Sequence, residues 1–301
     1  MWWGSVQPSP VVAWQCCHQT DPMLQDPDAT RLLAISPHLD DAVLSLGAGL
    51  ARAAQDGAKV TVYTVFAGTA PPPYSPAAER MHAIWGLSPN DDAPLYRREE
   101  DIAALGHLGV AYRHGRFLDS IYRKLPDGRW LTDHIEGGQK LAINPHSLDS
   151  DRELVPEIKH DIKSVIEECD PTLLVTCAAI GNHPDHEAAR DAALFAARDK
   201  NIPIRLWEDL PYAVFQSGTV ELPEGFHLGS LDFGSVETEA QARKFQAVEH
   251  YPSQMSMFNR RDKNLFDLLD EHARKTSQYG GYGETTWSVI RNEDNSSPTL
   301  V

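Results

Sequence analysis

Two short segments of the sequence carry the side chains best suited to bind a metal ion. Residues 36–41 read Ser-Pro-His-Leu-Asp-Asp, and residues 181–186 read Gly-Asn-His-Pro-Asp-His. Histidine nitrogens and carboxylate oxygens are typical ligands of a catalytic zinc ion, which takes three protein ligands and keeps one position open. If the fold brings the two segments together, they supply such a site.

His38 and Asp41 are three residues apart at an expected strand-to-helix turn, so both could reach one ion. The third ligand would come from His183 or His186. Asp40 would then be a spare carboxylate beside the metal, suited to accept a proton from water whose pKa zinc lowers to about 7. The chemistry that this set predicts is metal-assisted hydrolysis.

Each segment also has a simpler interpretation. Asp40 and Asp41 could cap and charge the N-terminus of the helix that follows. Residues 181–186 could be a polar turn in which Asp185 is the N-cap. The metal hypothesis is stronger when both are considered together, because ligands of an open α/β sheet bind beyond the carboxyl ends of its strands.

The elements that would position these residues alternate between strands and helices. Residues 31–37 form a short apolar run that ends at a proline, and residues 59–66 are rich in β-branched side chains. Between them, residues 41–56 have apolar positions at helical spacing. A strand–helix–strand unit of this kind implies a parallel pair with a right-handed crossover.

The same alternation continues, and it predicts a single α/β domain with a Rossmann-like, mostly parallel sheet flanked by helices. Further strands are expected at 110–118, 171–177 and 204–207. Further helices are expected near 76–86 and 92–108, from a first-turn proline at Pro156, and at 187–198. The stretch 119–155 is rich in Gly, Asp, His and Pro, and we expect an active-site loop or a small insertion there.

The two ends of the chain are expected to lie outside this domain. Residues 1–22 are interpreted as a poorly ordered N-terminal extension and residues 291–301 as a polar tail, which leaves 23–290 as the domain.

Composition excludes several classes of protein. With 27 Lys and Arg against 43 Asp and Glu, the formal net charge of −16 argues against a partner that is a nucleic acid or an anionic membrane. No apolar run reaches the roughly 18–20 residues of a membrane span. The four cysteines include no CxxC pair and are typical of free thiols in a reducing cytoplasm. The Gly47-Ala-Gly49 sequence falls inside the first expected helix, so it is no dinucleotide-binding turn.

The two metal-binding segments also resemble known signatures. SPHLDDA at 36–42 and HPDH at 183–186 resemble AHPDDE and HPDH of the PIG-L/LmbE family of zinc-dependent N-deacetylases. The likeness extends over about residues 30–290 and includes WEDLPY at 207–212, YPSQ at 251–254 and an RxxE formed by Arg97 and Glu100. Leu39 and Ala42 stand where the family usually has Pro and Glu; neither is a ligand, so zinc binding should survive.

The resemblance implies a role for several residues. The zinc ligands would be His38, Asp41 and His186, with one zinc ion per chain. Asp40 would be the general base, and either Asp40 or His183 would protonate the leaving amine.

His183 would also stabilise the oxyanion, and Asp185 would orient His183 and keep it protonated. Arg97 or Arg98, together with Asp119, match the sugar-contacting positions. Trp130 is the aromatic side chain that we expect to stack on a sugar ring.

The function implied is hydrolysis of the N-acetyl group of a GlcNAc-type amino sugar. Within the family, VFAGTAPPPYSPAAERMHAIWG at 65–86 is most similar to enzymes of secondary metabolism, which implies a small-molecule glycoside such as a glycopeptide antibiotic pseudoaglycone. Two alternatives remain open: an amidase on a thiol- or lipid-linked amino-sugar conjugate, and a non-catalytic sugar-binding module. The presence of Asp40 and His183 argues against the module, because a binder has no use for a base.

Overall fold

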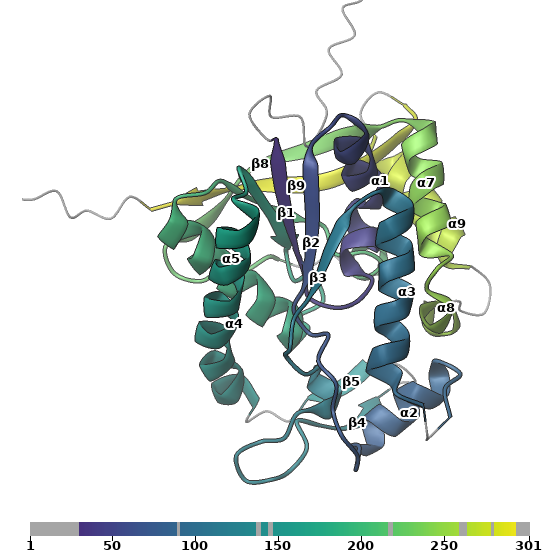
Figure 1. The fold of residues 1–301 in the computed structure, drawn as a ribbon, viewed down its shortest axis with the longest axis vertical. Helices are drawn as coiled ribbons and strands as arrows, with labels where there is room; N and C mark the ends of the chain where they lie inside the picture. Colours follow the sequence, from purple (N-terminus) through teal and green to yellow (C-terminus); the bar gives the residue numbers. More distant parts are fainter. Residues whose placement is uncertain are drawn as a thin grey trace, which may run out of the picture.

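A seven-stranded sheet with helices on both faces forms the body of the molecule (Figure 1). The computed structural model describes residues 30–88, 91–136, 140–143, 147–215, 219–258, 264–277 and 280–292. The strands of the sheet are β1 (Arg31–Ser36), β2 (Lys59–Thr64), β3 (Ala111–His114), β6 (Leu173–Cys177), β7 (Ile204–Trp207), β8 (Phe226–Val236) and β9 (Tyr282–Arg291).

Helices connect these strands, and two short strands form a separate antiparallel pair. The pair is β4 (Thr132–Glu136) with β5 (Lys140–Ile143). The helices are α1 (Asp41–Gln55), α2 (Pro76–Ile84), α3 (Ala93–Leu108), α4 (Ser147–Cys169), α5 (Pro184–Lys200), α6 (Tyr212–Phe215), α7 (Thr238–Val248), α8 (Pro252–Phe258), α9 (Leu265–Lys275) and the 3-10 turn η1 (Ser120–Tyr122).

The strand order is β3-β2-β1-β6-β7-β9-β8. The first five strands of this order are parallel, and β9 and β8 add an antiparallel edge. The chain moves outward from β1 to β2 and β3 in one direction and from β6 to β7 in the other. Consequently β1 and β6 flank the point where the order reverses, and such points are where open α/β sheets bind ligands.

Both faces of β1 are buried, which explains its continuous apolar sequence. Leu32 and Ala34 pack in a core with α1, α3, α7 and α9, while Leu33 and Ile35 pack in a second core with α4 and α5. Figure 1 shows α4 and α5 on one side of the sheet and α1, α3 and α7 on the other.

The predicted fold class is confirmed, but several boundaries are wrong. Helix α4 begins at Ser147, so Pro156 lies inside it rather than in its first turn. Strand β3 ends at His114, well before the expected 118. Helix α5 begins at Pro184, three residues early, so HPDH spans the helix N-terminus.

Several other expectations concern the segments beside the sheet. The 119–155 stretch holds η1, the β4–β5 pair and the start of α4, as a small insertion would. The predicted extension, residues 1–22, lies outside the described residues. Of the predicted tail, Arg291 is instead the last residue of β9, and 293–301 are outside the described part.

Helix α1 is interrupted in its middle by a buried ion pair. Leu46 has φ −122° and ψ 15°, outside the helical region. At this break the Glu284 carboxylate accepts hydrogen bonds from Ala48 N (3.1 Å) and Gly49 N (2.8 Å). Lys244 Nζ lies 2.7 Å from Glu284 Oε1 and donates to the carbonyl of Ser45 (3.2 Å). Lys244 and Glu284 therefore supply hydrogen-bond partners for the backbone groups that the break in α1 leaves without an intrahelical partner.

The Gly47-Ala-Gly49 sequence has a structural explanation at the same place. A Cβ added to Gly47 would lie 2.9 Å from Lys244 Cγ, closer than side chains approach. Glycine thus allows the Lys244 stem to reach the break.

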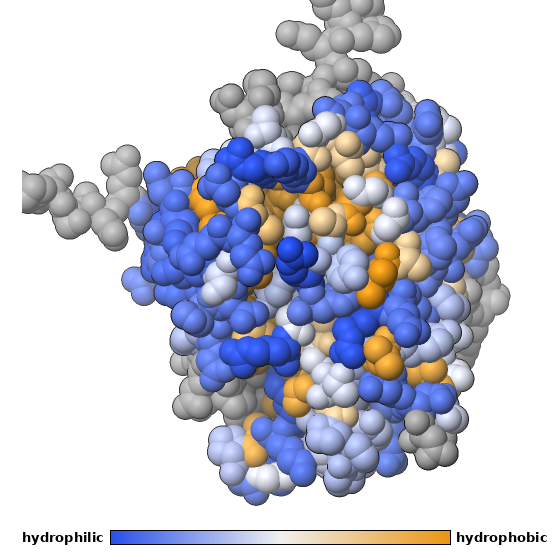
Figure 2. Space-filling model, in the orientation of Figure 1, coloured by the Kyte–Doolittle hydropathy of each residue, from blue (hydrophilic) through white to orange (hydrophobic). Residues whose placement is uncertain are grey.

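The surface seen in Figure 2 is mainly hydrophilic, with apolar side chains in scattered groups. Among the described residues, none of the helices has both the length and the apolar character needed to cross a membrane.

Candidate metal centre and active site

The two predicted segments meet at the carboxyl edge of the sheet. His38 follows β1, and His183 and His186 lie at the start of α5, after β6. Because β1 and β6 are neighbouring parallel strands in register from Leu32 and Leu173, both segments leave the sheet side by side. The site therefore lies at the point where the strand order reverses.

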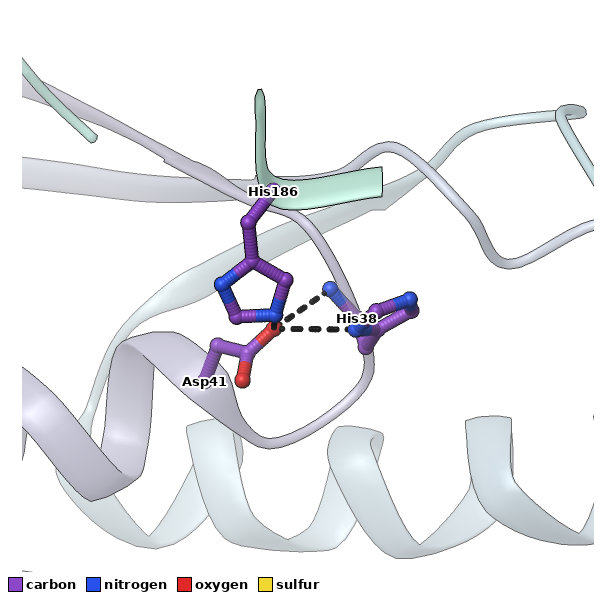
Figure 3. A group of neighbouring side chains, drawn as sticks. All are labelled: His38, Asp41 and His186. Carbon is purple, nitrogen blue, oxygen red and sulfur yellow. Dashed lines mark hydrogen bonds and ion pairs between the residues drawn. The ribbon is translucent and has the colours of Figure 1, made fainter. Parts of the chain in front are cut away.

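His38, Asp41 and His186 form a compact, buried group of metal-ligand type (Figure 3). Their ligand atoms all lie within 4.8 Å of one another. His38 Nδ1 and His186 Nε2 each lie 3.3 Å from Asp41 Oδ2. Two imidazole nitrogens and one carboxylate oxygen around a single point match the ligand set of catalytic zinc sites.

The second nitrogen of each histidine faces another carboxylate. His186 Nδ1 lies 2.7 Å from Asp209 Oδ1, and His38 Nε2 lies 3.0 Å from Asp185 Oδ2. A carboxylate accepts the proton of the nitrogen that it faces, which leaves the opposite nitrogen with its lone pair. His186 Nε2 is buried and receives no hydrogen bond from any described residue, as expected of a nitrogen reserved for a metal.

The same carboxylates enclose the histidines in negative charge. Although burial opposes the change, Asp119, Asp185 and Asp41 together raise the pKa of His38 to about 10. Asp41 and Asp209 likewise raise the pKa of His186 against the effect of burial. A centre that holds protons in this way favours a cation, and a metal ion must displace those protons to bind.

Asp40 is buried beside the group and does not cap α1. It occupies the N-cap position, but its side chain makes no capping hydrogen bond, so the capping interpretation is wrong for this residue. Burial raises the pKa of Asp40 to about 8, with Asp41 adding to the shift and Arg97 and His38 opposing it. A carboxyl whose pKa lies near neutrality is suited to exchange protons during turnover.

The expected pairing of Asp185 with the His183 side chain is wrong. The Asp185 carboxylate instead contacts His38 Nε2, Arg123 Nη1 (2.6 Å) and the amide of Ser120 (2.9 Å). Because α5 begins at Pro184, His183 is the N-cap and its Nδ1 accepts the amide proton of Asp185 at 3.2 Å. The two side chains therefore point to different neighbours.

The surroundings of His183 favour the neutral imidazole over the expected cation. Burial lowers the pKa of His183 to about 3, and the charge of Asp185 offsets this shift only in part. Since Nδ1 accepts a hydrogen bond, the ring proton is on Nε2, which can act as a neutral donor.

The residues predicted to contact the sugar separate into two groups. Arg97 lies 3.6 Å from Asp40 Oδ1, and Asp119 lies 3.8 Å from His38 Nε2, so both face the site. Arg98 instead donates to Ala67 O (2.7 Å) and Thr69 Oγ1 (2.9 Å). The Trp130 ring packs under Lys124 Nζ at 4.4 Å from the ring centroid.

Three residues of the site were not predicted from the sequence. Asp209 supports His186 and also accepts the amide proton of Ile180 (3.0 Å). Tyr212 stands edge-on to the His186 ring, with centroids 5.5 Å apart. Both lie in WEDLPY, directly after β7, a position that could have indicated them; Arg123 had no comparable signal.

The other two shared motifs contact each other. Glu100 of the RxxE accepts hydrogen bonds from the amide (2.9 Å) and hydroxyl (2.6 Å) of Ser253 in YPSQ. The neighbouring Asp101 accepts from Tyr251 OH (2.6 Å). These contacts hold α3, which carries Arg97, to the segment that begins α8.

Comparison with known proteins agrees with this geometry. Residues 33–197 match the family model PIG-L, described as GlcNAc-PI de-N-acetylase. A 1D-myo-inositol 2-acetamido-2-deoxy-alpha-D-glucopyranoside deacetylase of Streptomyces griseus is 34% identical over 177 residues, 58% of this chain and 50% of that protein. The chain thus spans about half the length of the first curated relatives that it matches.

Solved structures are similar over nearly their whole length. The zinc-inhibited form of teicoplanin deacetylase Orf2 has a TM-score of 0.84 and 73% identity, covering 88% of this chain and 99% of that one. The A40926 pseudoaglycone deacetylase Dbv21 has a TM-score of 0.77 and 57% identity, covering 88% and 99%. From the matched family model and these structures, we conclude that the chain belongs to the PIG-L family.

Proposed function

We propose that this protein is a zinc-dependent hydrolase that removes the N-acetyl group from a GlcNAc-type sugar on a glycopeptide antibiotic pseudoaglycone. The observation that carries the proposal is the His38–Asp41–His186 group with Asp40 buried beside it. The similar solved proteins are by name deacetylases of teicoplanin and of the A40926 pseudoaglycone. The sugar named for the curated relatives also bears a 2-acetamido group.

His38 Nδ1, Asp41 Oδ2 and His186 Nε2 would hold one zinc ion per chain. When bound, zinc acts as a Lewis acid and brings the pKa of water to about 7. Asp185 and Asp209 fix the orientation of the two ligand histidines through their other ring nitrogens.

Asp40 moves the proton. It accepts one from the attacking water on Oδ2, because Oδ1 faces the Arg97 guanidinium. The same carboxyl then returns the proton to the nitrogen of the leaving amine. His183 is not the acid in this scheme, since its low pKa keeps the imidazole neutral.

His183 stabilises the carbonyl oxygen as it becomes negative. Its Nε2–H is the donor, and the Asp185 amide holds its Nδ1. A fixed donor aimed at a developing oxyanion is worth about 3–4 kcal/mol in comparable sites.

A mass-spectrometric turnover assay tests the proposal. Zinc-loaded protein is incubated with N-acetylglucosaminyl compounds of increasing aglycone size, and with lipid- and thiol-linked amino-sugar conjugates. We expect release of acetate, fastest with the glycopeptide pseudoaglycone and about 10²- to 10⁴-fold slower with Asp40→Asn. Asp170→Asn, an exposed carboxylate just before β6, is the matched control. Preferred turnover of a lipid or thiol conjugate would support the amidase alternative, and binding without turnover would support the sugar-binding module.

A further inference from the structure

We propose that Tyr212 is a further catalytic residue, whose phenolic hydroxyl donates a hydrogen bond to the oxyanion of the tetrahedral intermediate. This inference rests on the proposed deacetylation and adds a second donor to its oxyanion site. Tyr212 is the first residue of α6, in the segment that follows β7.

Tyr212 and His183 lie against the same ligand histidine. The Tyr212 ring meets the His186 ring at 89°, with centroids 5.5 Å apart. The His183 and His186 ring centroids are 5.2 Å apart. Tyr212 and His183 therefore both lie against the His186 ring, whose Nε2 faces Asp41 at the proposed metal position. The carbonyl of the substrate must bind beside this position to be hydrolysed.

The backbone that carries Tyr212 is tied to the rest of the site. Asp209 bonds to His186 on one side and to the amide of Ile180 on the other. The amide of Leu210 donates to Ser45 Oγ (3.1 Å), and the amide of Glu208 to the carbonyl of Thr285 (3.2 Å). A donor on a segment held at so many points is preorganised, as oxyanion stabilisation requires.

The hydroxyl of Tyr212 is not used inside the protein. No described residue hydrogen-bonds to it, although the side chain is half-buried. The hydroxyls of three other tyrosines that are buried all have partners: Tyr63 with Asp161, Tyr122 with His82, and Tyr251 with Asp101. A half-buried tyrosine beside the proposed metal ligands, whose hydroxyl is free to donate, is suited to hydrogen-bond an atom of the substrate.

Two other polar side chains beside the site are placed differently. Asn182, directly before His183, is exposed, and Arg97 faces Asp40.

The test compares Tyr212→Phe with wild type, using zinc-loaded protein and the substrate that the turnover assay above identifies. The substitution keeps the ring against His186 and removes only the hydroxyl. We expect kcat to fall by about 10- to 10³-fold, as for removal of one oxyanion donor, with KM and zinc content unchanged. Tyr112→Phe, an exposed position on β3, is the control and should behave as wild type. An unchanged kcat, a loss confined to KM, or a loss of zinc would overturn the proposal.

Calorimetric binding separates this inference from the proposed function. The probe is a methylphosphonamidate of glucosamine, which mimics the tetrahedral oxyanion. Tyr212→Phe should bind it about 10- to 10³-fold more weakly than wild type, and should bind the intact acetamide equally well. If wild type shows no turnover, the proposed function fails, and this comparison still decides the role of Tyr212. Equal binding by both proteins, or no binding by wild type, would overturn it.

Discussion

Each of the two histidines that we propose as ligands divides its ring nitrogens between the proposed metal position and a carboxylate. For His186 the carboxylate is Asp209, which is buried and is itself held by the amide of Ile180. Such a carboxylate fixes the tautomer and raises the basicity of the ligand nitrogen. Its loss should weaken the metal site without removing a ligand.

We predict that Asp209→Asn binds zinc about 10- to 100-fold more weakly than wild type, whereas His186→Ala loses zinc. Competition with a zinc chelator measures the affinity, and Asp170→Asn is the control. Wild-type affinity in Asp209→Asn would show that His186 needs no such support. Undiminished zinc in His186→Ala would remove His186 from the ligand set.

Asp40 and Asp41 are adjacent carboxylates that we assign to different tasks. Asp40→Asn should retain zinc and lose about 10²- to 10⁴-fold in turnover, because the amide cannot accept the proton. Elemental analysis and kcat are measured on the same preparation. If the substitution strips the metal from folded protein, Asp40 is a ligand.

The pKa of Asp40 also predicts how the stability of the metal-free protein depends on pH. Burial raises this pKa from 3.8 to about 8, so between these values the folded protein holds a proton that the unfolded chain has released. Stability from this group is therefore greatest near pH 4 and falls as the pH rises to 8. Asp40→Asn removes this dependence, so it should be more stable than wild type at pH 8 and similar near pH 4. Urea unfolding of chelator-treated protein gives the two curves, and parallel curves would contradict the assignment.

At the scale of elements, the break in α1 depends on two residues from distant parts of the chain. Glu284 of β9 and Lys244 of α7 are buried and bind each other, and each also bonds to the free backbone groups at the break. The first half of α1 carries Asp41, and Ser45 at its end accepts the amide proton of Leu210. The break therefore joins the ligand helix to the segment that holds Asp209.

We predict that Glu284→Gln lowers the free energy of unfolding by about 3–5 kcal/mol, because Lys244 is left as an unpaired buried charge. Asp270→Asn breaks an exposed pair with Arg274 and should cost less than about 1 kcal/mol. Urea unfolding at constant pH measures both. Similar costs for the two substitutions would mean that water reaches the buried pair.

The elements closest to the site were the most predictable from the sequence. Strands β1 and β6 are short apolar runs that are followed directly by the segments with His38 and Asp41 and with His183 and His186, so the position of the site and its proposed metal ligands followed from local patterns. Strands β8 and β9 were missed because they form the antiparallel edge, where burial is partial and no apolar run marks them.

Side-chain partners were less predictable than the ligands themselves. The Asp185–Arg123 contact joins α5 to the segment after η1, and no spacing in the sequence indicates it. The family resemblance assigned Asp185 to His183, whereas the carboxylate contacts His38 Nε2 from the first turn of α5.

At the scale of the whole molecule, the family signature covers less than the folding unit. Residues 33–197 contain all three proposed ligands, but not Asp209, β7, or the β9 strand that pairs with it. We predict that a fragment of residues 30–200 does not reach the native state. Circular dichroism and hydrogen exchange, with the full chain as control, measure this, and cooperative unfolding with tight zinc binding by the fragment would contradict it.

The position of β9 between β7 and β8 has a consequence for the order of events during synthesis. The proposed ligands His38, Asp41 and His186 leave the ribosome early. Thr285, whose carbonyl accepts the amide proton of Glu208, and Glu284, which bonds at the break in α1, leave it much later. Pairing over such a sequence separation is slow and must wait for the later strand. Metal acquisition should therefore be a late step, completed by a strand that contributes no proposed ligand.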